Sequence, residues 1–270
     1  MNPSRFLLLL LAVGLTAFGS AQDQTSPPPS APGGTSQPAS PDAPTQTNQQ
    51  RVITIDDSGG TQSGNLRFGP IVYEHPDPFG IKATVSTLTI YGHHAVLKAP
   101  DGVSIFKGGE RTATFDGGVK VERGRLTATG PSLVYSEERN LGQLTEQGGQ
   151  VTITRTDADG KKLVITADEI RVLTDQKKLY ATGNVTVVDG SITSKGATVF
   201  FDDNQAIAEI LGAAGKPATA VDSKNGSSLR ADRIKQDVKY DYFEAMDASA
   251  PSLFDTSAFA MTPPSGSSSP

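Results

Sequence analysis

The sequence contains no cysteine and no tryptophan among its 270 residues. The absence of cysteine excludes disulfide bonds, thiol catalysis, cysteine-ligated zinc, iron–sulfur clusters and a cysteine-linked lipid anchor. The formal net charge of -5 argues against a nucleic-acid partner, whose phosphates attract clustered lysine and arginine. Apolar residues make up only 36% of the chain, and this low share averages over segments of very different character.

The first 21 residues have the pattern of a secretory signal peptide. Arg5 supplies the positive start, residues 6–18 are apolar, and residues 19–21 (Gly-Ser-Ala) are small, as a signal peptidase requires. The apolar run is shorter than the roughly 20 residues that span a bilayer, so a retained membrane anchor is the less favoured alternative. We therefore expect cleavage before Gln22 and export of the mature chain.

Two segments lack the apolar residues that a folded core requires. Residues 22–50 hold seven of the 18 prolines and no Leu, Ile, Val or aromatic residue, so we expect a disordered spacer. Residues 251–270 are expected to form a disordered tail, although its few apolar residues could dock locally: Leu253, Phe254, Phe259 and Met261.

The region between these segments has the pattern of a β-protein. From about residue 80 to 250, glycines separate short runs in which apolar and polar residues alternate, such as Val-Lys-Val at 119–121. This pattern predicts many short antiparallel strands. Residues 167–173 and 206–211 could compete as helices, but we expect strands there too. Residues 51–79 are interpreted as a lead-in with possible edge strands at 51–55 and 71–73, where nearby proline is tolerated.

An internal repeat supports the same interpretation. A shift of 66 residues places Gly117 on Gly183 and Gly130 on Gly196, with apolar residues matching between them. A shorter element, a large aliphatic residue followed by any residue and then a small one, recurs five times, for example as Ile-Thr-Ala at 165–167. Such units predict stacked hairpins that bury one continuous apolar seam, which a single unit could not bury alone.

Three neighbouring segments together resemble a known family. They are Ile-Thr-Ala-Asp-Glu-Ile at 165–170, Leu-Tyr-Ala-Thr-Gly-Asn-Val-Thr-Val at 179–187 and Ile-Thr-Ser-Lys-Gly at 192–196. This sequence pattern resembles that of the OstA-like family, the periplasmic lipopolysaccharide-transport proteins of the LptA type, over about residues 80–250. The resemblance implies an all-β fold, an open-ended twisted β-jellyroll of many short antiparallel strands. It also implies a periplasmic location, a groove for acyl chains, and end-to-end joining with itself or with homologous jellyroll domains through edge strands.

No catalytic or metal site is predicted. His93 and His94 are neighbours on a strand and point to opposite faces, and with His75 they are expected at the surface. Acidic pairs at 56–57, 137–138 and 202–203 lie in or before turns and are expected to be solvated. The turn at 157–160 lacks the further ligands of a calcium loop. Because nucleophile and phosphate-binding motifs are also missing, we expect neither an enzyme nor a cofactor.

The remaining candidate site is the apolar stripe of the alternating strands, whose simplest interpretation is a closed core. Under the resemblance, the same residues become candidates for a lipid groove: Val119, Val121, Leu126, Leu133, Tyr135, Ile165, Val185, Val187, Ile192, Val199 and Phe201. Basic residues near strand ends could then meet anionic head groups: Lys120, Arg123, Arg125, Lys161, Lys162, Lys177 and Lys178. The favoured hypothesis is a carrier or bridge for lipopolysaccharide or another amphipathic envelope lipid, and the alternatives are a structural envelope scaffold with a closed core and, least favoured, an exported hydrolase.

Overall fold

The computed structural model describes residues 52–146, 150–247, 252 and 254–261, all of which belong to the unit Gln46–Pro270. The predicted signal peptide, its cleavage site and the spacer at 22–50 lie outside the described residues. The predicted tail lies partly outside them.

The described residues form an all-β structure with nineteen strands and one short 3-10 helix, η2 (Thr256–Phe259). Every strand pairing is antiparallel, which confirms the predicted fold class, and the two segments that could compete as helices contain strands. The strands are β1 (Thr54–Asp56), β2 (Thr61–Gly64), β3 (Ile71–Glu74), β4 (Ile81–Val85), β5 (Leu88–Gly92), β6 (His94–Lys98), β7 (Thr112–Arg123), β8 (Leu126–Ser136), β9 (Leu141–Thr145), β10 (Val151–Thr156), β11 (Lys162–Ala167), β12 (Glu169–Leu173), β13 (Lys178–Asp189), β14 (Ile192–Asp202), β15 (Ile207–Leu211), β16 (Ala218–Asp222), β17 (Ser228–Ala231), β18 (Arg233–Asp237) and β19 (Tyr242–Met246).

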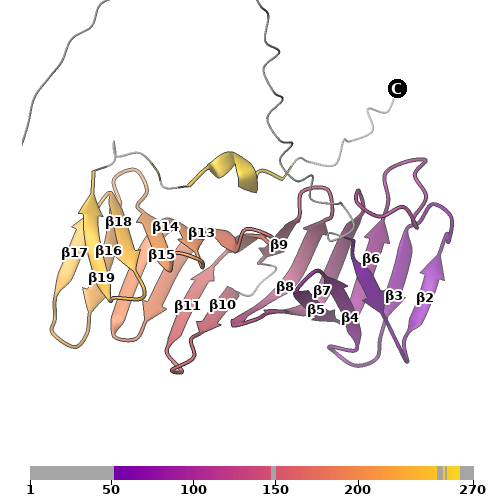
Figure 1. Ribbon diagram of the computed structural model, residues 1–270, viewed down its shortest axis with the longest axis horizontal. Coiled ribbons are helices and arrows are strands. Elements are labelled where there is room, and N and C mark those ends of the chain that lie inside the picture. The colour runs from indigo at the N-terminus through magenta and orange to yellow at the C-terminus, as the bar shows by residue number, and fades with distance from the viewer. Residues whose placement is uncertain (1–51, 147–149, 248–251, 253, 262–270) are drawn as a thin grey trace, which may run out of the picture. The chain divides into compact units, whose positions relative to one another are not determined.

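The strand pairings follow two ladders that share four long strands (Figure 1). The first ladder runs β1–β4–β5–β7–β8–β10–β11–β13–β14–β16–β17. The second runs β2–β3–β6–β7–β8–β9–β12–β13–β14–β15–β18–β19. Each long strand gives one half to each ladder, so the ladders meet along the middle of β7, β8, β13 and β14.

A bulge marks the place where each long pair passes from one ladder to the other. The register shifts between Asp116 and Val119 in β7 and between Thr182 and Val185 in β13. Gly117 and Gly183 occupy these bulges, both with φ +80°. A Cβ on Gly183 would lie 2.2 Å from an Asp168 oxygen, so glycine meets both a backbone and a packing requirement there.

The same corner explains part of the sequence motif. Asn184, with φ 47°, donates from its side-chain nitrogen to the Asp168 carboxylate at 2.9 and 3.2 Å. Asn tolerates this left-handed conformation better than most residues. The Ala-Asp and Gly-Asn-Val parts of the sequence pattern therefore meet at this bulge, although Asp168 and Asn184 are 16 residues apart in the chain.

The repeat found in the sequence corresponds to a structural repeat. A shift of 66 residues maps the bounds of β7, β8 and β9 onto those of β13, β14 and β15. The small residue of the recurring three-residue element is buried in Ala83, Ala128, Ala167 and Ser194. Small side chains at these positions allow the two ladders to approach each other closely.

The core fills the space between the ladders. One buried apolar cluster extends along the chain from Ile53 to Val238, and its largest fully buried members include Phe115, Tyr135 and Phe201. Burial of each such side chain contributes roughly 1.5–3 kcal/mol of transfer free energy.

A second, smaller cluster forms where η2 packs on the second ladder. Phe254 and Phe259 pack against Phe200, Leu141 and Leu173. The rings of Phe200 and Phe254 stack with their centroids 5.3 Å apart. The apolar residues at 254–261 therefore dock locally within the region predicted as a tail.

Candidate functional site

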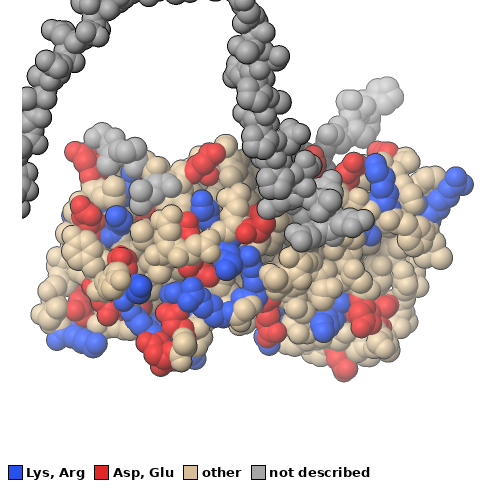
Figure 2. All heavy atoms as spheres, in the orientation of Figure 1, with Lys and Arg blue, Asp and Glu red and all other residues tan. Residues whose placement is uncertain are grey.

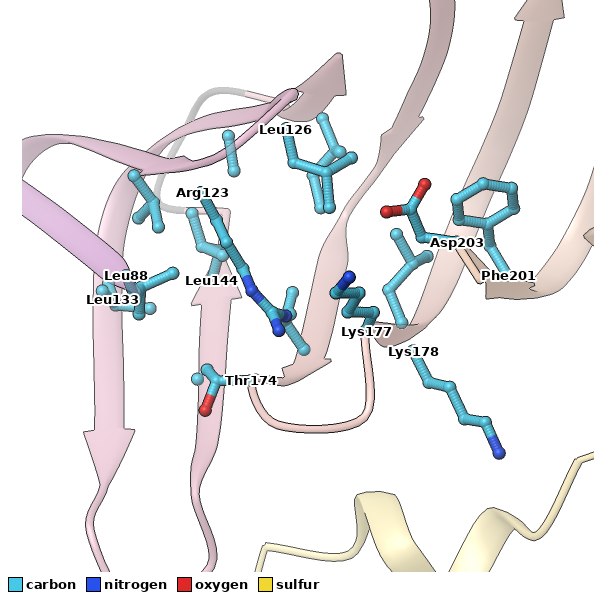
Figure 3. A pocket seen from close by; sticks show the side chains of 16 residues that line it. Leu88, Arg123, Leu126, Leu133, Leu144, Thr174, Lys177, Lys178, Phe201 and Asp203 are labelled. Atoms are coloured by element: carbon cyan, nitrogen blue, oxygen red, sulfur yellow. The ribbon is translucent and has the colours of Figure 1, made fainter. Parts of the chain in front are cut away.

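A narrow apolar pocket opens between the two ladders (Figure 3). The pocket is narrow, with a cavity volume of about 40 Å³. The first ladder contributes β5, β7, β8 and β10 to its lining, and the second contributes β8, β9, β12, β13 and β14. The apolar residues of the wall are Leu88, Val121, Leu126, Ala128, Leu133, Leu144, Ile153, Val172, Leu179 and Phe201.

The structure divides the predicted groove residues into three groups. Four of them line the pocket: Val121, Leu126, Leu133 and Phe201. Six are buried in the main core away from it: Val119, Tyr135, Ile165, Val185, Val187 and Val199. Ile192 is buried beside a separate polar opening near Asp189 and Asp241. The sequence analysis missed the pocket residues on β5, β9, β10 and β12, whose alternating pattern does not differ from that of the closed core.

Three basic side chains stand at the mouth of the pocket. Arg123, Lys177 and Lys178 line it together with Thr174 and Asp203. Figure 3 shows Arg123 extending into the pocket, with Leu88, Leu133 and Leu144 on one side and Asp203 and Phe201 on the other. Its Nη1 atom is buried and has no hydrogen-bond partner among the described residues. Burial lowers the pKa of the Arg123 guanidinium, while the charges of Asp203 and Asp175 oppose that shift.

Asp203 connects the two ladders across this mouth. It directly follows the C-terminal end of β14, the half of that strand that belongs to the second ladder. Its carboxylate accepts from Arg125 Nη2 at 3.0 Å. The same oxygen lies 2.8 Å from Nε of Arg155, which belongs to the first ladder. Both arginines also pair with Asp157, at 3.1 and 3.0 Å. We call this four-residue group, Arg125, Arg155, Asp157 and Asp203, the central clasp.

A second cross-ladder clasp lies toward the N-terminal edge. Glu137, which follows β8, is paired with Arg111 at 2.6 Å and accepts from the backbone N–H of Ile53 and Gly109, both at 2.7 Å. Burial alone would raise the pKa of the Glu137 carboxyl, but the hydrogen bonds from Arg111 and the backbone lower it overall. Because Ile53 leads into β1 of the first ladder, this pair also ties the two ladders together.

A third clasp lies toward the C-terminal edge. Lys161 of the first ladder pairs with Asp189 at 3.0 Å and with Asp241, and donates to the Val238 carbonyl at 3.0 Å. Burial alone would lower the pKa of the Lys161 ammonium, but its carboxylate partners raise it overall. Burial raises the pKa of the Asp189 carboxyl although Lys161 opposes it. Of the remaining predicted basic residues, Lys120 pairs with Glu122 and Lys162 is exposed.

The expectation of solvated acidic turns is wrong at three positions, Glu137, Asp202 and Asp203, and Asp202 is only 4% exposed. Glu137 is fully buried and Asp203 is 6% exposed, because arginines from elsewhere in the fold neutralise them. A signal was present in the sequence, since the 66-residue shift places Glu137 on Asp203 and Arg111 on Lys177. The structure repeats that relation: the N–H of each acid donates to the carbonyl of the matching basic residue, both at 3.0 Å.

The expected surface position of the histidines is also wrong in part. The side chain of His75 is only 8% exposed, and His93 packs so closely that a Cβ on Gly117 would lie 2.0 Å from its ring. The ring of His75 packs against Gly80 and that of His93 against Gly117. Among the described residues, no group of three or more His, Asp or Glu side chains is placed to hold a metal ion. Within the same residues, no helix has the length and apolar character needed to cross a membrane.

Charged side chains of both signs are interspersed over the surface, and several basic side chains gather over the middle of the face shown in Figure 2. The pocket therefore combines an apolar lining with charged groups at its opening. Such an arrangement suits a ligand with an apolar body and a charged end.

Comparison with known proteins finds one family model that is similar to the central part of the chain. Residues 106–207 match the model of a family described as LptA and the N-terminal domain of LptD, lipopolysaccharide-transport proteins. Among solved structures, the chain is similar to LptH of Pseudomonas aeruginosa, described as the LptA-homologous periplasmic component of the lipopolysaccharide transport device. The two are 15% identical with a TM-score of 0.36, and the match covers 50% of this chain and 92% of that one. Among curated protein sequences, none matches the chain.

Proposed function

We propose that this chain, whose residues 106–207 match the model of the LptA and LptD N-terminal domain family, is a non-enzymatic carrier or bridge for an amphipathic envelope lipid. The family match confirms the resemblance inferred from residues 165–196. The lipid would be lipopolysaccharide or another envelope amphiphile moving toward the outer membrane. The signal-like N-terminus supports a periplasmic location.

The observation that carries this proposal is the pocket between the ladders. Its wall is almost wholly apolar, and its charged lining residues are Arg123, Lys177, Lys178 and Asp203. Each methylene of an acyl chain that enters such a wall contributes about 0.8 kcal/mol. A water-soluble ligand would gain little from these contacts, whereas an acyl chain would gain several kcal/mol.

Bridging would use the ends of the ladders. In the described part of the chain, β1 and β2 pair on one side only at one end, and β17 and β19 do so at the other. Unpaired strand edges accept a further strand through backbone hydrogen bonds. We therefore propose that a second copy, or a homologous jellyroll domain, adds its edge strand at either end.

A structural scaffold with a closed core is the second candidate. The observation in its favour is that the protein's own residues fully bury Tyr135, Val187 and Val199. A scaffold would keep its ladders together permanently, and the cross-ladder clasps would serve stability alone.

Native mass spectrometry of the exported, full mature chain separates the two candidates. A carrier is expected to release a bound amphiphile that solvent extraction then identifies, and the stripped chain should rebind it. A chain that never holds an acyl-bearing molecule, whether purified from the envelope or incubated with lipopolysaccharide and phospholipid, would favour the scaffold.

A further inference from the structure

Several cationic side chains gather around Asp203 at the pocket. Arg123, Arg125 and Arg155 all surround Asp203, and Lys177 also lines the opening. We propose that this mouth is an anion-exchange latch. The phosphate or carboxylate of an acyl-bearing amphiphile replaces the Asp203 carboxylate at Arg125 and Arg155 and contacts Arg123, and the exchange releases one ladder from the other. This inference rests on the proposed lipid-binding function of the groove.

The first support is the environment of Arg123. Its Nη1 is buried with no hydrogen-bond partner, beside side chains that are mostly apolar. A buried guanidinium without a full set of acceptors carries a desolvation cost that a bound anion would remove. An anion joined to an acyl chain fits best, because the pocket wall beside the guanidinium accepts only apolar groups.

The second support is that the first ladder contributes only side chains to the closure, although Arg125 Nη2 also donates to the backbone carbonyl of Asp203 at 3.2 Å. The carboxylate of Asp203 is held by two guanidiniums from the first ladder, at 3.0 and 2.8 Å. Arginine side chains can rotate toward a phosphate or carboxylate, for which their fork-shaped donors are well suited. No hydrogen bond between two backbone groups has to break for such an exchange.

The third support comes from the other copy of the repeat. Glu137 holds the position equivalent to Asp203, but its carboxylate accepts from the backbone N–H groups of Ile53, Gly109 and Arg111 as well as from Arg111's side chain. Backbone donors in the fold cannot turn toward a ligand. The N-terminal clasp is therefore a fixed closure, while the central clasp, built from side chains, can exchange its anion.

The test compares amphiphiles that share one acyl chain. Palmitoyl lysophosphatidic acid and palmitate carry an anion, monopalmitoylglycerol carries none, and inorganic phosphate supplies the anion alone. We expect the full mature chain to bind both anionic amphiphiles at least about tenfold more tightly than monopalmitoylglycerol, since a charge-assisted hydrogen bond is worth roughly that factor. Arg123→Gln should reduce this preference to below about threefold, while Lys195→Gln, which changes an exposed lysine of the first ladder, should leave it intact.

Asp203→Asn removes the competing carboxylate. It should strengthen binding of lysophosphatidic acid by roughly threefold or more and leave monopalmitoylglycerol unchanged. Equal strengthening for both, or an anion preference that survives Arg123→Gln, would overturn the latch. Inorganic phosphate that binds as tightly as the amphiphiles would assign the site to free phosphate. Failure of every acyl compound to bind would instead contradict the proposed function itself.

A second measurement avoids altering the clasp. Ala158→Cys and Gln205→Cys place unique cysteines on exposed positions of the first and second ladder, because the chain has no other cysteine. Spin labels at these sites should report longer separations when lysophosphatidic acid is bound. An unchanged distance distribution in the lipid-bound protein would contradict release of the ladders.

Discussion

Glu137 and Asp203 stand 66 residues apart at equivalent ends of β8 and β14, and each closes the two ladders with arginine partners. The first is sealed by backbone donors and contacts Ile53 at the N-terminal edge, while the second stands at the mouth of the apolar pocket. The two copies of the repeat therefore differ: the N-terminal clasp is held by backbone donors, and the central clasp borders the candidate site.

Glu137→Gln should destabilise the fold strongly. Removing one partner of a buried ion pair leaves the other charge uncompensated, at a cost of roughly 3–5 kcal/mol. Urea unfolding of the mature chain measures the change, and Glu138→Gln, at the exposed neighbouring position, serves as the control. Similar unfolding midpoints for both variants would show that the N-terminal clasp contributes little.

The same residue predicts a pH dependence. The pKa of Glu137 is lowered from the ordinary value of 4.5, so the unfolded chain binds a proton at a pH where the folded chain does not. Its contribution to stability is therefore fully present above about 4.5 and is lost as pH falls through the lowered folded value. The stability difference between the parent and Glu137→Gln should shrink in that acidic window. A constant difference down to about pH 3 would contradict this assignment.

Gly183→Ala tests the corner at the bulge. The new Cβ would meet Asp168 at 2.2 Å on a backbone with φ +80°, and both effects destabilise. Gly160→Ala is the matched control, since Gly160 has φ +83° but open space around it. We expect the control to lose about 1 kcal/mol and Gly183→Ala to lose clearly more, to roughly 3 kcal/mol. Equal losses in thermal or urea unfolding would mean that backbone conformation alone explains the glycine.

Leu126→Trp should block the groove without opening the core. Leu126 is a partly buried wall residue, and the larger ring would occupy space that an acyl chain needs. Exclusion of only two methylenes weakens binding by more than about tenfold. Palmitate titration measures the effect, with Thr129→Trp at an exposed position of the same strand as the control. Unchanged affinity in the Leu126 variant would place the acyl chain elsewhere.

Much of the fold follows from local pattern. Period-two alternation predicts the strands, and the 66-residue repeat locates both bulges through Gly117 and Gly183. These features depend on backbone conformation and on which face of a strand is buried, and both are recorded in neighbouring residues. The strand at 207–211 was identified because its repeat partner is a poor helix, even though its own residues favour helix.

The division between groove and core does not follow from local pattern. Val121 at the pocket and Val187 in the closed core have the same alternating surroundings, since alternation indicates the buried face and says nothing about the separation of the ladders. The buried acids were missed for a related reason. Glu137 and Asp203 stand in turn-like sequence, while their arginine partners lie far away along the chain, 26 residues for Arg111 and 78 for Arg125.

Photo-crosslinking from inside the groove tests the central claim most directly. A photoreactive amino acid at Val172 faces the pocket from β12, whereas one at Arg171 on the same strand lies on the opposite face, where its guanidinium donates to Phe259. In the full chain expressed in a diderm envelope, the account predicts a lipid adduct from position 172 and none from 171. Lipid adducts at equal yield from both positions, or from neither, would contradict a lipid-binding groove between the ladders.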